Sequence, residues 1–213
     1  MTSMLDASAE DPPGARTALQ LARQRCSSEP MRPHAVGVVG LGYVGLPTAL
    51  SLTEAGMAVV GYDVNESRLA AIKAQQIDLL PADHARLNRW LGSTQLVLTT
   101  EAAALSQVDT VVVCVPTPVD AHLVPDLSAL AAACNSVVAH AVPGQTILLT
   151  STTYVGCTRD LLVKPLHERG LVVGRDVFVA FSPERIDPGV AAHVPERTPR
   201  VVGGTPRNAR AER

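Results

Sequence analysis

The sequence predicts an α/β fold, a doubly wound parallel sheet between two layers of helices in a three-layer α/β/α arrangement. Two observations carry this prediction. From Val36 onward, strand-like and helix-like segments alternate, and each expected strand is apolar on both faces, as a parallel strand covered by helices should be. Turn residues also stand where strands begin, with Asp109 before the fourth strand and Pro143-Gly144 before the fifth.

The alternation gives bounds for each element. The expected strands are Ala35–Val39, Ala58–Tyr62, Leu96–Thr99, Thr110–Val115, Thr146–Thr150, Val177–Phe181 and Arg200–Val202. The expected helices are Leu46–Ala55, Glu66–Gln75, His84–Leu91, Ala102–Leu105, Leu127–His140 and Cys157–Arg169. Ligands of such sheets bind beyond the carboxyl ends of the strands, so functional residues are expected in the loops that follow the strands.

A glycine-rich run, Gly40–Gly45 (GLGYVG), follows the first expected strand and opens the first expected helix. The second strand then leads to Asp63, and this order of strand, glycine turn, helix, strand and acid is typical of a Rossmann-like dinucleotide-binding unit. Gly40 permits the tight turn, Gly42 lets the backbone approach a pyrophosphate, and Gly45 lets the helix lie close on the sheet. The helix N-terminus offers unpaired N–H groups to the phosphates.

The acid after the second strand indicates which dinucleotide is bound. Asp63 is placed to accept a hydrogen bond from a ribose 2′-hydroxyl, and its carboxylate repels the 2′-phosphate of NADP, so NAD is the expected cofactor. A plain strand-to-helix turn is the alternative, since glycine turns are common. Because the strand, the helix and the acid all agree, the dinucleotide interpretation is favoured.

Composition and charge narrow the class of protein. The chain has 213 residues, of which 46% are hydrophobic, 18% charged and only 3% aromatic, so Val, Leu and Ala must fill a globular core. Eighteen basic against twenty acidic residues give a net charge of -2, and nothing in this balance indicates a nucleic-acid surface.

The cysteines argue against a metal site. Cys26, Cys114, Cys134 and Cys157 form no Cys-x-x-Cys pair and no Cys/His cluster with zinc spacing. Cys114 falls in an apolar strand and Cys134 in an alanine-rich helix, and both are interpreted as small core residues. The pattern fits a reducing cytoplasm.

The first 33 residues contain charges and prolines throughout and lack the apolar region of a signal peptide. We expect a flexible extension there, with a short helix around Thr17 to Arg25. No apolar run is long enough to span a bilayer, so no membrane contact is expected. The predicted organisation is this extension, an NAD-binding Rossmann domain over residues 34–204, and a tail over residues 205–213.

The loops after the later strands carry unusual sequences. They are the proline-fixed Val115-Pro116-Thr117-Pro118, the hydroxyl-rich Ser151-Thr152-Thr153-Tyr154-Val155-Gly156-Cys157, then Ser182-Pro183-Glu184-Arg185-Ile186-Asp187-Pro188-Gly189, and finally Val201-Val202-Gly203-Gly204. In this order, together with the glycine turn and the Asp63 strand, these segments closely resemble the UDP-glucose/GDP-mannose dehydrogenase family, the nucleotide-sugar 6-dehydrogenases. The resemblance covers roughly Val36 to Gly204. Any one motif is ordinary, whereas the ordered set is specific.

The resemblance implies an activity and a branch of the family. Members oxidise C6 of a nucleotide sugar from alcohol to carboxylate with two NAD and supply precursors of cell-surface polysaccharides. PTPVD, Asp126-Leu127-Ser128 and SPERIDPG look most like the UDP-N-acetylglucosamine 6-dehydrogenase branch, because UDP-glucose dehydrogenases usually carry a PEFL-type loop at Pro183–Ile186. The implied substrate is therefore a UDP-sugar, UDP-N-acetylglucosamine-like or UDP-glucose.

The resemblance also implies roles for single residues. The implied cofactor-binding residues are Gly40, Gly42, Tyr43, Val44 and Gly45 at the pyrophosphate, Asp63 at the adenosine ribose, Arg68 near the adenine, and Pro116, Thr117 and Thr152 on the nicotinamide side. Thr152 also matches a threonine that helps to position a catalytic water. Glu184 matches a glutamate that acts as a base, or holds that water, during hydrolysis of a thioester.

Structural roles remain alternatives for these residues. Thr152 could only cap the following helix, and Glu184 could only cap the next segment or pair with Arg185 on the surface. Cys157 is a candidate nucleophile because helix N-termini lower the pKa of a thiol, but a small residue filling the start of a helix is the favoured interpretation. Tyr154 and its neighbours depart from the usual PGTT-like ending of this loop, which weakens the transfer of roles near Thr152.

Family members continue into a central helix and a second α/β domain that holds the UDP and a catalytic cysteine in a Gly-x-Cys-x-Pro segment. This sequence ends at Arg213 without those parts, and we expect it to be inactive alone. Three hypotheses follow: a truncated NAD-binding portion of a nucleotide-sugar 6-dehydrogenase, half of a split enzyme, or a non-catalytic NAD-binding module. The implied protein partners are a second copy or the missing half, and an apolar patch is expected near Val201 and Val202.

Overall fold

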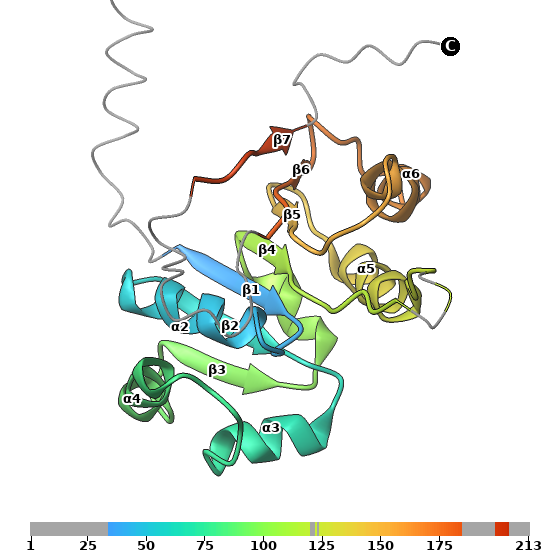
Figure 1. Cartoon of the computed structure of the whole chain (residues 1–213). Coiled ribbons are helices and arrows are strands. Elements are labelled where there is room, and N and C mark those ends of the chain that lie inside the picture. The colour runs from blue at the N-terminus through green and yellow to red at the C-terminus, as the bar shows by residue number, and fades with distance from the viewer. Residues whose placement is uncertain (1–33, 120–121, 123, 185–198, 205–213) are drawn as a thin grey trace, which may run out of the picture. The chain divides into compact units, whose positions relative to one another are not determined.

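A computed structural model of the chain describes residues 34–119, 122, 124–184 and 199–204. Within these residues a seven-stranded sheet runs in the order β3-β2-β1-β4-β5-β6-β7 (Figure 1). All neighbouring strands from β3 to β6 are parallel, and β7 pairs antiparallel with β6. This confirms the doubly wound α/β prediction. The predicted N-terminal extension, its helix around Thr17 and the tail over residues 205–213 lie outside the described residues.

The first three strands have the predicted bounds, and the other elements differ mostly at their ends. The strands are β1 Ala35–Val39, β2 Ala58–Tyr62, β3 Leu96–Thr99, β4 Thr110–Val113, β5 Thr146–Leu149, β6 Phe178–Phe181 and β7 Gly203–Gly204. The helices are α2 Gly45–Glu54, α3 Glu66–Lys73, α4 Pro81–Trp90, the 3-10 helix η1 Ala102–Gln107, α5 Ser128–His140, the π-helix η2 Arg159–Val163 and α6 Lys164–Glu168.

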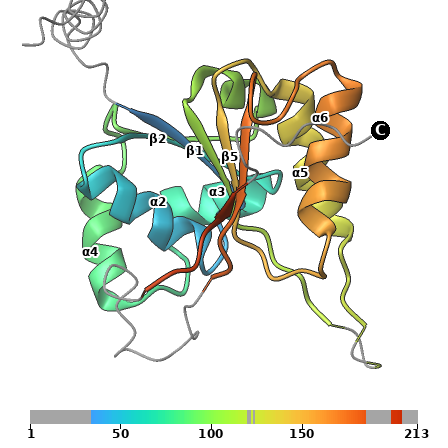
Figure 2. The same cartoon turned by 90° about the horizontal axis from the view of Figure 1, so that it is seen from above.

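Helices cover the sheet on both faces. Figure 2 shows α2 and α4 on one side of the sheet and α5 and α6 on the other. Each face has its own apolar cluster. Because successive side chains of a strand point to opposite faces, one strand contributes to both clusters: Val111 and Val113 of β4 pack on the α5 side and Val112 on the α2 side. The side chains of the two clusters are mainly Val, Leu and Ala, as the low aromatic content predicts. No helix in the described part of the chain is both long and apolar enough to cross a bilayer.

The predicted helix Cys157–Arg169 differs in its interior. Its middle is the π-helix η2, in which the N–H of Lys164 donates to the carbonyl of Arg159, five residues back. Pro165 follows directly and has no N–H to donate, and a proline ring in a regular helix would clash with the carbonyl four residues earlier. A wider turn relieves both problems, so the proline gives a physical reason for the π segment.

The last predicted strand was placed wrongly. Arg200–Val202 is not a strand; the chain pairs instead through Gly203 and Gly204, antiparallel to Phe181 and Ala180. The side chains of Val201 and Val202 are 76% and 63% exposed, so the apolar residues that indicated a buried parallel strand do not pack in the described core. Both valines are exposed, as expected for an apolar patch near these residues.

Gln145 fixes the start of β5 against the neighbouring connection. Its side-chain NH₂ donates to the carbonyls of Leu105 at 2.7 Å and Val108 at 2.8 Å, and its Oε1 accepts from the N–H of Val142 at 2.9 Å. The residue is 2% exposed. A single buried amide therefore satisfies three backbone groups that have no strand partner at these positions.

We expect Gln145→Ala to lower the free energy of unfolding by about 2–3 kcal/mol, because it leaves buried carbonyls and an N–H without partners. Urea unfolding followed by circular dichroism would measure the change. Gln107→Ala, at an exposed glutamine at the end of η1, is the matched control and should stay within about 0.5 kcal/mol of the wild type. Equal losses in the two variants would contradict the structural role of Gln145.

Candidate functional site

The glycine turn joins β1 to α2 and leaves no room for side chains at two positions. Gly40 has φ +86°, and a Cβ there would stand 2.8 Å from Val115 Cγ1. A Cβ on Gly45 would stand 1.8 Å from the Gly40 carbonyl oxygen. The first turn of α2 therefore packs directly on the turn that precedes it, and a Cβ on Gly45 would also stand 3.3 Å from Cys114 Cβ, next to the end of β4.

Gly42 is in a different environment. A Cβ built there meets nothing within 4 Å, so the backbone at Gly42 faces open space. The next helix, α2, begins after Val44, which gives no side-chain cap, and its first turn contains no acidic residue. Uncapped N–H groups and a positive helix end at an open surface form a site that suits an anion.

The carboxylate of Asp63 is bonded to the same turn. Its Oδ2 accepts from the N–H of Leu41 at 2.8 Å, and its Oδ1 accepts from the N–H of Asn65 at 2.9 Å. Arg68 Nη1 donates to the Leu41 carbonyl at 3.2 Å. These bonds hold the end of β2, the start of α3 and the glycine turn as one unit.

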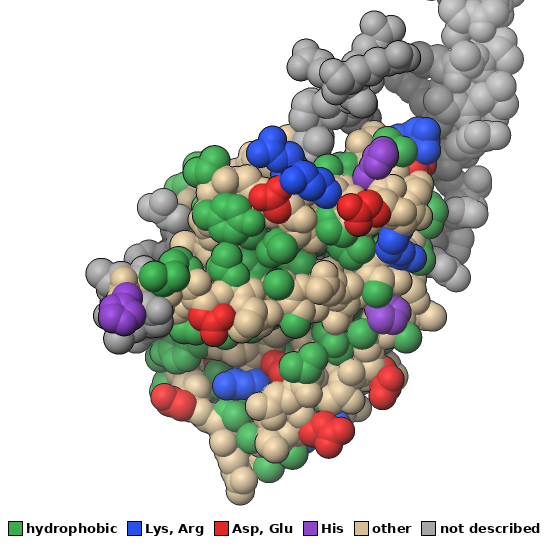
Figure 3. Space-filling view, turned by 90° about the vertical axis from the view of Figure 1, so that its right-hand side faces the viewer, with side chains coloured by type: hydrophobic (Ala, Val, Ile, Leu, Met, Phe, Trp, Pro, Cys, Tyr) green, Lys and Arg blue, Asp and Glu red, His purple; other side chains and the backbone are tan. Residues whose placement is uncertain are grey.

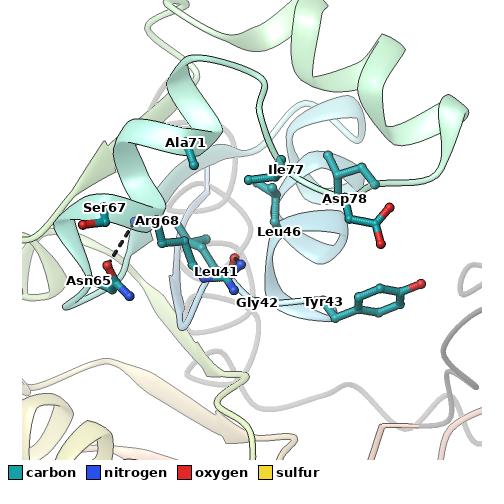
Figure 4. A pocket seen from close by; sticks show the side chains of 11 residues that line it. Leu41, Gly42, Tyr43, Leu46, Asn65, Ser67, Arg68, Ala71, Ile77 and Asp78 are labelled. Atoms are coloured by element: carbon teal, nitrogen blue, oxygen red, sulfur yellow. Dashed lines mark hydrogen bonds between the residues drawn. The ribbon is translucent and has the colours of Figure 1, made fainter.

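Three depressions meet at this unit, and Gly42 and Arg68 line all of them. The Asp63 cleft, ≈ 240 Å³, also contains Asp63, Val64, Asn65, Val115, Pro116 and the α5 residues Ala129, Ala132, Ala133 and Ser136. The Thr152 cleft, ≈ 350 Å³, also contains Tyr43, Val44, Pro116, Thr117, Ser151, Thr152 and Glu184. The Asp78 cleft, ≈ 420 Å³, also contains Tyr43, Asn65, Ser67, Ile77, Asp78 and Leu79 (Figure 4).

The structure brings the predicted site residues together. Of the predicted set, only Gly45 lies outside these depressions, since it packs under the turn; Gly40, Gly42, Tyr43, Val44, Asp63, Arg68, Pro116, Thr117, Thr152 and Glu184 all line at least one. Asp78, which lines the Asp78 cleft, and Arg200, which pairs with Glu184, were not among the predicted site residues. Asp78 lies between two helices and not after a strand, and Arg200 was assigned to a buried strand. In the described part of the chain, no group of three His, Cys, Asp or Glu could hold a metal ion.

The loops after β4 and β5 are tied together. Thr117 Oγ1 donates to the Thr152 carbonyl at 2.9 Å, and Ser151 Oγ donates to the Val115 carbonyl at 2.7 Å. The helical segment after this loop begins only at Cys157, so Thr152 is too early in the chain to be its cap. Thr152 is instead an exposed residue on the wall of the Thr152 cleft.

Glu184 forms an ion pair with a residue distant in the sequence. Its Oε1 lies 2.8 Å from Arg200 Nη2, and its side chain is 12% exposed against 29% for Arg200. The backbone N–H of Glu184 donates to the Thr150 carbonyl at 3.1 Å, which fixes the residue at the end of β5. Glu184 is thus a mostly buried carboxylate at the Thr152 cleft, whereas the surface pair predicted as an alternative involves Arg185, outside the described residues.

The cysteines of the described residues are buried. Cys114 and Cys134 lie in the two core clusters, as predicted, and burial raises the pKa of Cys114 to about 11 and that of Cys134 to about 12. Cys157 is also fully buried, and desolvation raises the pKa of its thiol. A buried thiol with a raised pKa is a poor nucleophile, so the structure favours the core interpretation of Cys157.

A sequence model described as the UDP-glucose/GDP-mannose dehydrogenase family, NAD binding domain, matches residues 34–213. The chain belongs to this family. Protein CapL of Staphylococcus aureus is 38% identical over 170 residues, which are 79% of this chain and 39% of that protein. The UDP-N-acetyl-D-glucosamine 6-dehydrogenase of Pseudomonas aeruginosa is 35% identical over 176 residues, which are 82% of this chain and 41% of that protein.

Solved structures agree with this family assignment. The UDP-D-ManNAc dehydrogenase of Pyrococcus horikoshii superposes with a TM-score of 0.71 at 31% identity, over 80% of this chain and 41% of that chain. The chain therefore spans about two fifths of the length of these relatives. The family resemblance found in the sequence motifs is confirmed, and so is NAD as the cofactor of the matched domain.

Stability measurements can distinguish the tightly packed Gly45 from the open Gly42 at the start of α2. In a helix, Gly→Ala alone would stabilise by about 1 kcal/mol. We expect Gly45→Ala to destabilise by about 3 kcal/mol, because its Cβ would overlap the Gly40 carbonyl, and Gly42→Ala to stay within about 0.5 kcal/mol. Denaturant unfolding of both variants measures this, and a stabilised Gly45→Ala would show that α2 does not pack as described.

The Glu184–Arg200 pair can be measured with a double-mutant cycle of Glu184→Gln and Arg200→Met. We expect a coupling of about 1 kcal/mol in the free energy of unfolding, because the Glu184 side chain is 12% exposed and that of Arg200 is 29% exposed. The Lys164–Asp160 pair has the same 2.8 Å distance but exposed side chains, and its coupling should stay below about 0.5 kcal/mol. Equal couplings would contradict the burial of the Glu184 pair.

Proposed function

We propose that the chain binds NAD along the Asp63 and Thr152 clefts, with the pyrophosphate crossing the open backbone at Gly42. The observation that carries this proposal is the contrast between three glycines: Gly40 and Gly45 are closed by packing, whereas Gly42 is open. Only a backbone without a side chain at that point admits a phosphate close to the uncapped start of α2.

The residues that line the two clefts suggest where each end of the dinucleotide would bind. The Asp63 cleft offers a carboxylate for the adenosine ribose and an apolar wall of valine, proline and alanine for the adenine. The Thr152 cleft offers the hydroxyl-lined loops of Thr117 and Thr152 for the nicotinamide side. Tyr43 and Val44 line the Thr152 cleft with Gly42 and would lie beside the pyrophosphate.

We further propose that the whole protein is a UDP-sugar 6-dehydrogenase, acting on a UDP-N-acetylhexosamine. The similarity to known enzymes supports this: a UDP-N-acetyl-D-glucosamine 6-dehydrogenase and two UDP-N-acetyl-D-mannosamine dehydrogenases are 31–35% identical to the chain. Bound NAD would supply the hydride acceptor for oxidation at C6 of the sugar. This chain would supply Glu184 as the base or water-holding carboxylate and Thr152 to position that water, and both line one cleft.

We propose that the thiol needed for this chemistry is supplied from outside the described residues, because the cysteines within them are buried. A second copy or a cysteine-bearing half is the protein partner that would complete the site. The free cysteines are compatible with a reducing compartment such as the cytoplasm. There the protein would act on nucleotide sugars that are precursors of polysaccharides.

Titration calorimetry with NAD on the full chain tests the cofactor site. We expect the wild type to bind and Gly42→Ala to weaken binding at least about tenfold, because a methyl group would stand where the pyrophosphate must pass. Asp63→Ala should weaken binding too, through loss of the ribose contact. Gln107→Ala should bind as the wild type does. Unchanged affinity in a folded Gly42→Ala would contradict the proposed path.

A further inference from the structure

Glu184 stands between two depressions of the molecule. On one side is the Thr152 cleft, and on the other is a depression of ≈ 360 Å³ that we call the Pro47 hollow. The residues that line the hollow but not the cleft include Pro47, Leu52, Val112, Leu148 and Arg200. Three residues line both depressions and form the partition between them: Cys114, Thr150 and Glu184.

Arg200 reaches Glu184 from the side of the hollow. It lines the Pro47 hollow and is not among the residues that line the Thr152 cleft, and its Nη2 lies 2.8 Å from Oε1 of Glu184. The ion pair therefore crosses the partition, with its negative member at the cleft and its positive member behind. The two charges do not cancel inside the cleft, because the carboxylate is the nearer one.

Glu184 also gives the Thr152 cleft its local charge. Among the described residues that line this cleft, Glu184 is the one acid and Arg68 the one strong base. Arg68 also lines the Asp63 cleft, which the proposed path assigns to the adenosine. Glu184 instead lies beside the loop after β5, since its N–H donates to the carbonyl of Thr150 at 3.1 Å. The proposed nicotinamide end therefore meets a carboxylate that is mostly shielded from water.

The two redox states of the cofactor differ in charge at this end. The nicotinamide ring of NAD carries a positive charge, and the ring of NADH is neutral because it has accepted a hydride. A carboxylate beside the ring attracts the oxidised form and lacks this attraction for the reduced form. The low exposure of Glu184 strengthens the effect, because water screens a shielded charge only weakly.

We propose that the Glu184–Arg200 pair sets the preference of the site for NAD over NADH: Glu184 favours the oxidised cofactor, and Arg200 reduces that preference from behind the partition. The inference rests on the proposed function, since it places the nicotinamide in the Thr152 cleft. Oxidation of an alcohol to a carboxylate removes two hydrides, so two NAD must bind and two NADH must leave for each sugar. A site that favours NAD supports this exchange, and Arg200 limits how tightly the oxidised form is held.

The test uses titration calorimetry to measure the dissociation constants of NAD, NADH and ADP-ribose for the full chain and its variants. We expect Glu184→Gln to lower the preference for NAD over NADH at least about fivefold and Arg200→Met to raise it at least about threefold. Arg200→Lys keeps the positive charge and should stay within about twofold of the wild type. ADP-ribose lacks the nicotinamide ring, so its affinity should change less than about twofold in every variant.

The Arg175–Asp176 ion pair is the matched control. It has the same 2.8 Å distance but precedes β6, whereas Glu184 follows the other end of that strand. Asp176→Asn and Arg175→Met should each change the preference less than about twofold, because water and salt screen charges over that separation. The net charge is -2, and Figure 3 shows acidic and basic side chains interspersed on one face, so we expect nearby charges to set the preference.

The outcomes separate the inference from the proposed function. Opposite changes in Glu184→Gln and Arg200→Met, with ADP-ribose affinity unchanged, support the inference, because a role in folding alone would not move the two ratios in opposite directions. Unchanged ratios, changes in the same direction, equal changes for ADP-ribose, or equal changes in the control pair overturn it while NAD binding stands. Absence of binding by the folded wild type overturns both. Circular dichroism confirms folding, and Glu184→Met or Arg200→Gln replaces a variant that does not fold.

Discussion

The contact between Gly45 and the Gly40 carbonyl is the constraint on which the rest of this structure depends. A Cβ on Gly45 would stand 1.8 Å from that oxygen, so α2 can begin where it does only because the side chain is absent. Given that start, the apolar face of α2 reaches β1 and β2 and closes one of the two core clusters. The same start directs the uncapped end of the helix toward the clefts. Folding and ligand access therefore depend on one close approach of backbone to backbone.

Two carboxylates near the clefts are held in place before any ligand arrives. Asp63 is held by two backbone N–H groups and Glu184 by Arg200 and by its own backbone bond to β5. A side chain that is already ordered loses little conformational entropy when it binds, which favours both affinity and a defined geometry. The antiparallel strand β7 contributes to this order at Glu184. It brings the segment that carries Arg200 back to the end of β6, where the guanidinium can reach Glu184.

The parts of the fold that depend on the local pattern of apolar and turn residues were predicted from the sequence. The bounds of β1, β2 and β3 were right because short apolar runs flanked by turn residues specify buried parallel strands. The π segment was not predicted, because the effect of Pro165 depends on how the helix continues around it. Gly203 and Gly204 have no side chains and thus no pattern, so β7 could not be located. In the site, the loops after strands were predicted by rule. Asp78 reaches its cleft, and Arg200 reaches Glu184, only through tertiary packing.

The burial of the cysteines bears on how the proposed chemistry is divided. The Thr152 cleft brings together a carboxylate and hydroxyl-bearing loops, but Cys114 at its inner wall has a pKa raised to about 11 by burial and a sulfur 3.2 Å from the Thr150 hydroxyl. A thiol in that state stays protonated near neutral pH, so it fills space and does not attack a carbonyl. In the proposed reaction a thiolate must therefore approach the sugar from outside the described residues, through the open side of the cleft. Because the carboxylate is already fixed on the inner side by Arg200, the sugar would lie between two groups supplied by different parts of the protein. Under the proposed division, this chain would bind NAD and present the carboxylate, and turnover would need a thiolate from another part of the protein.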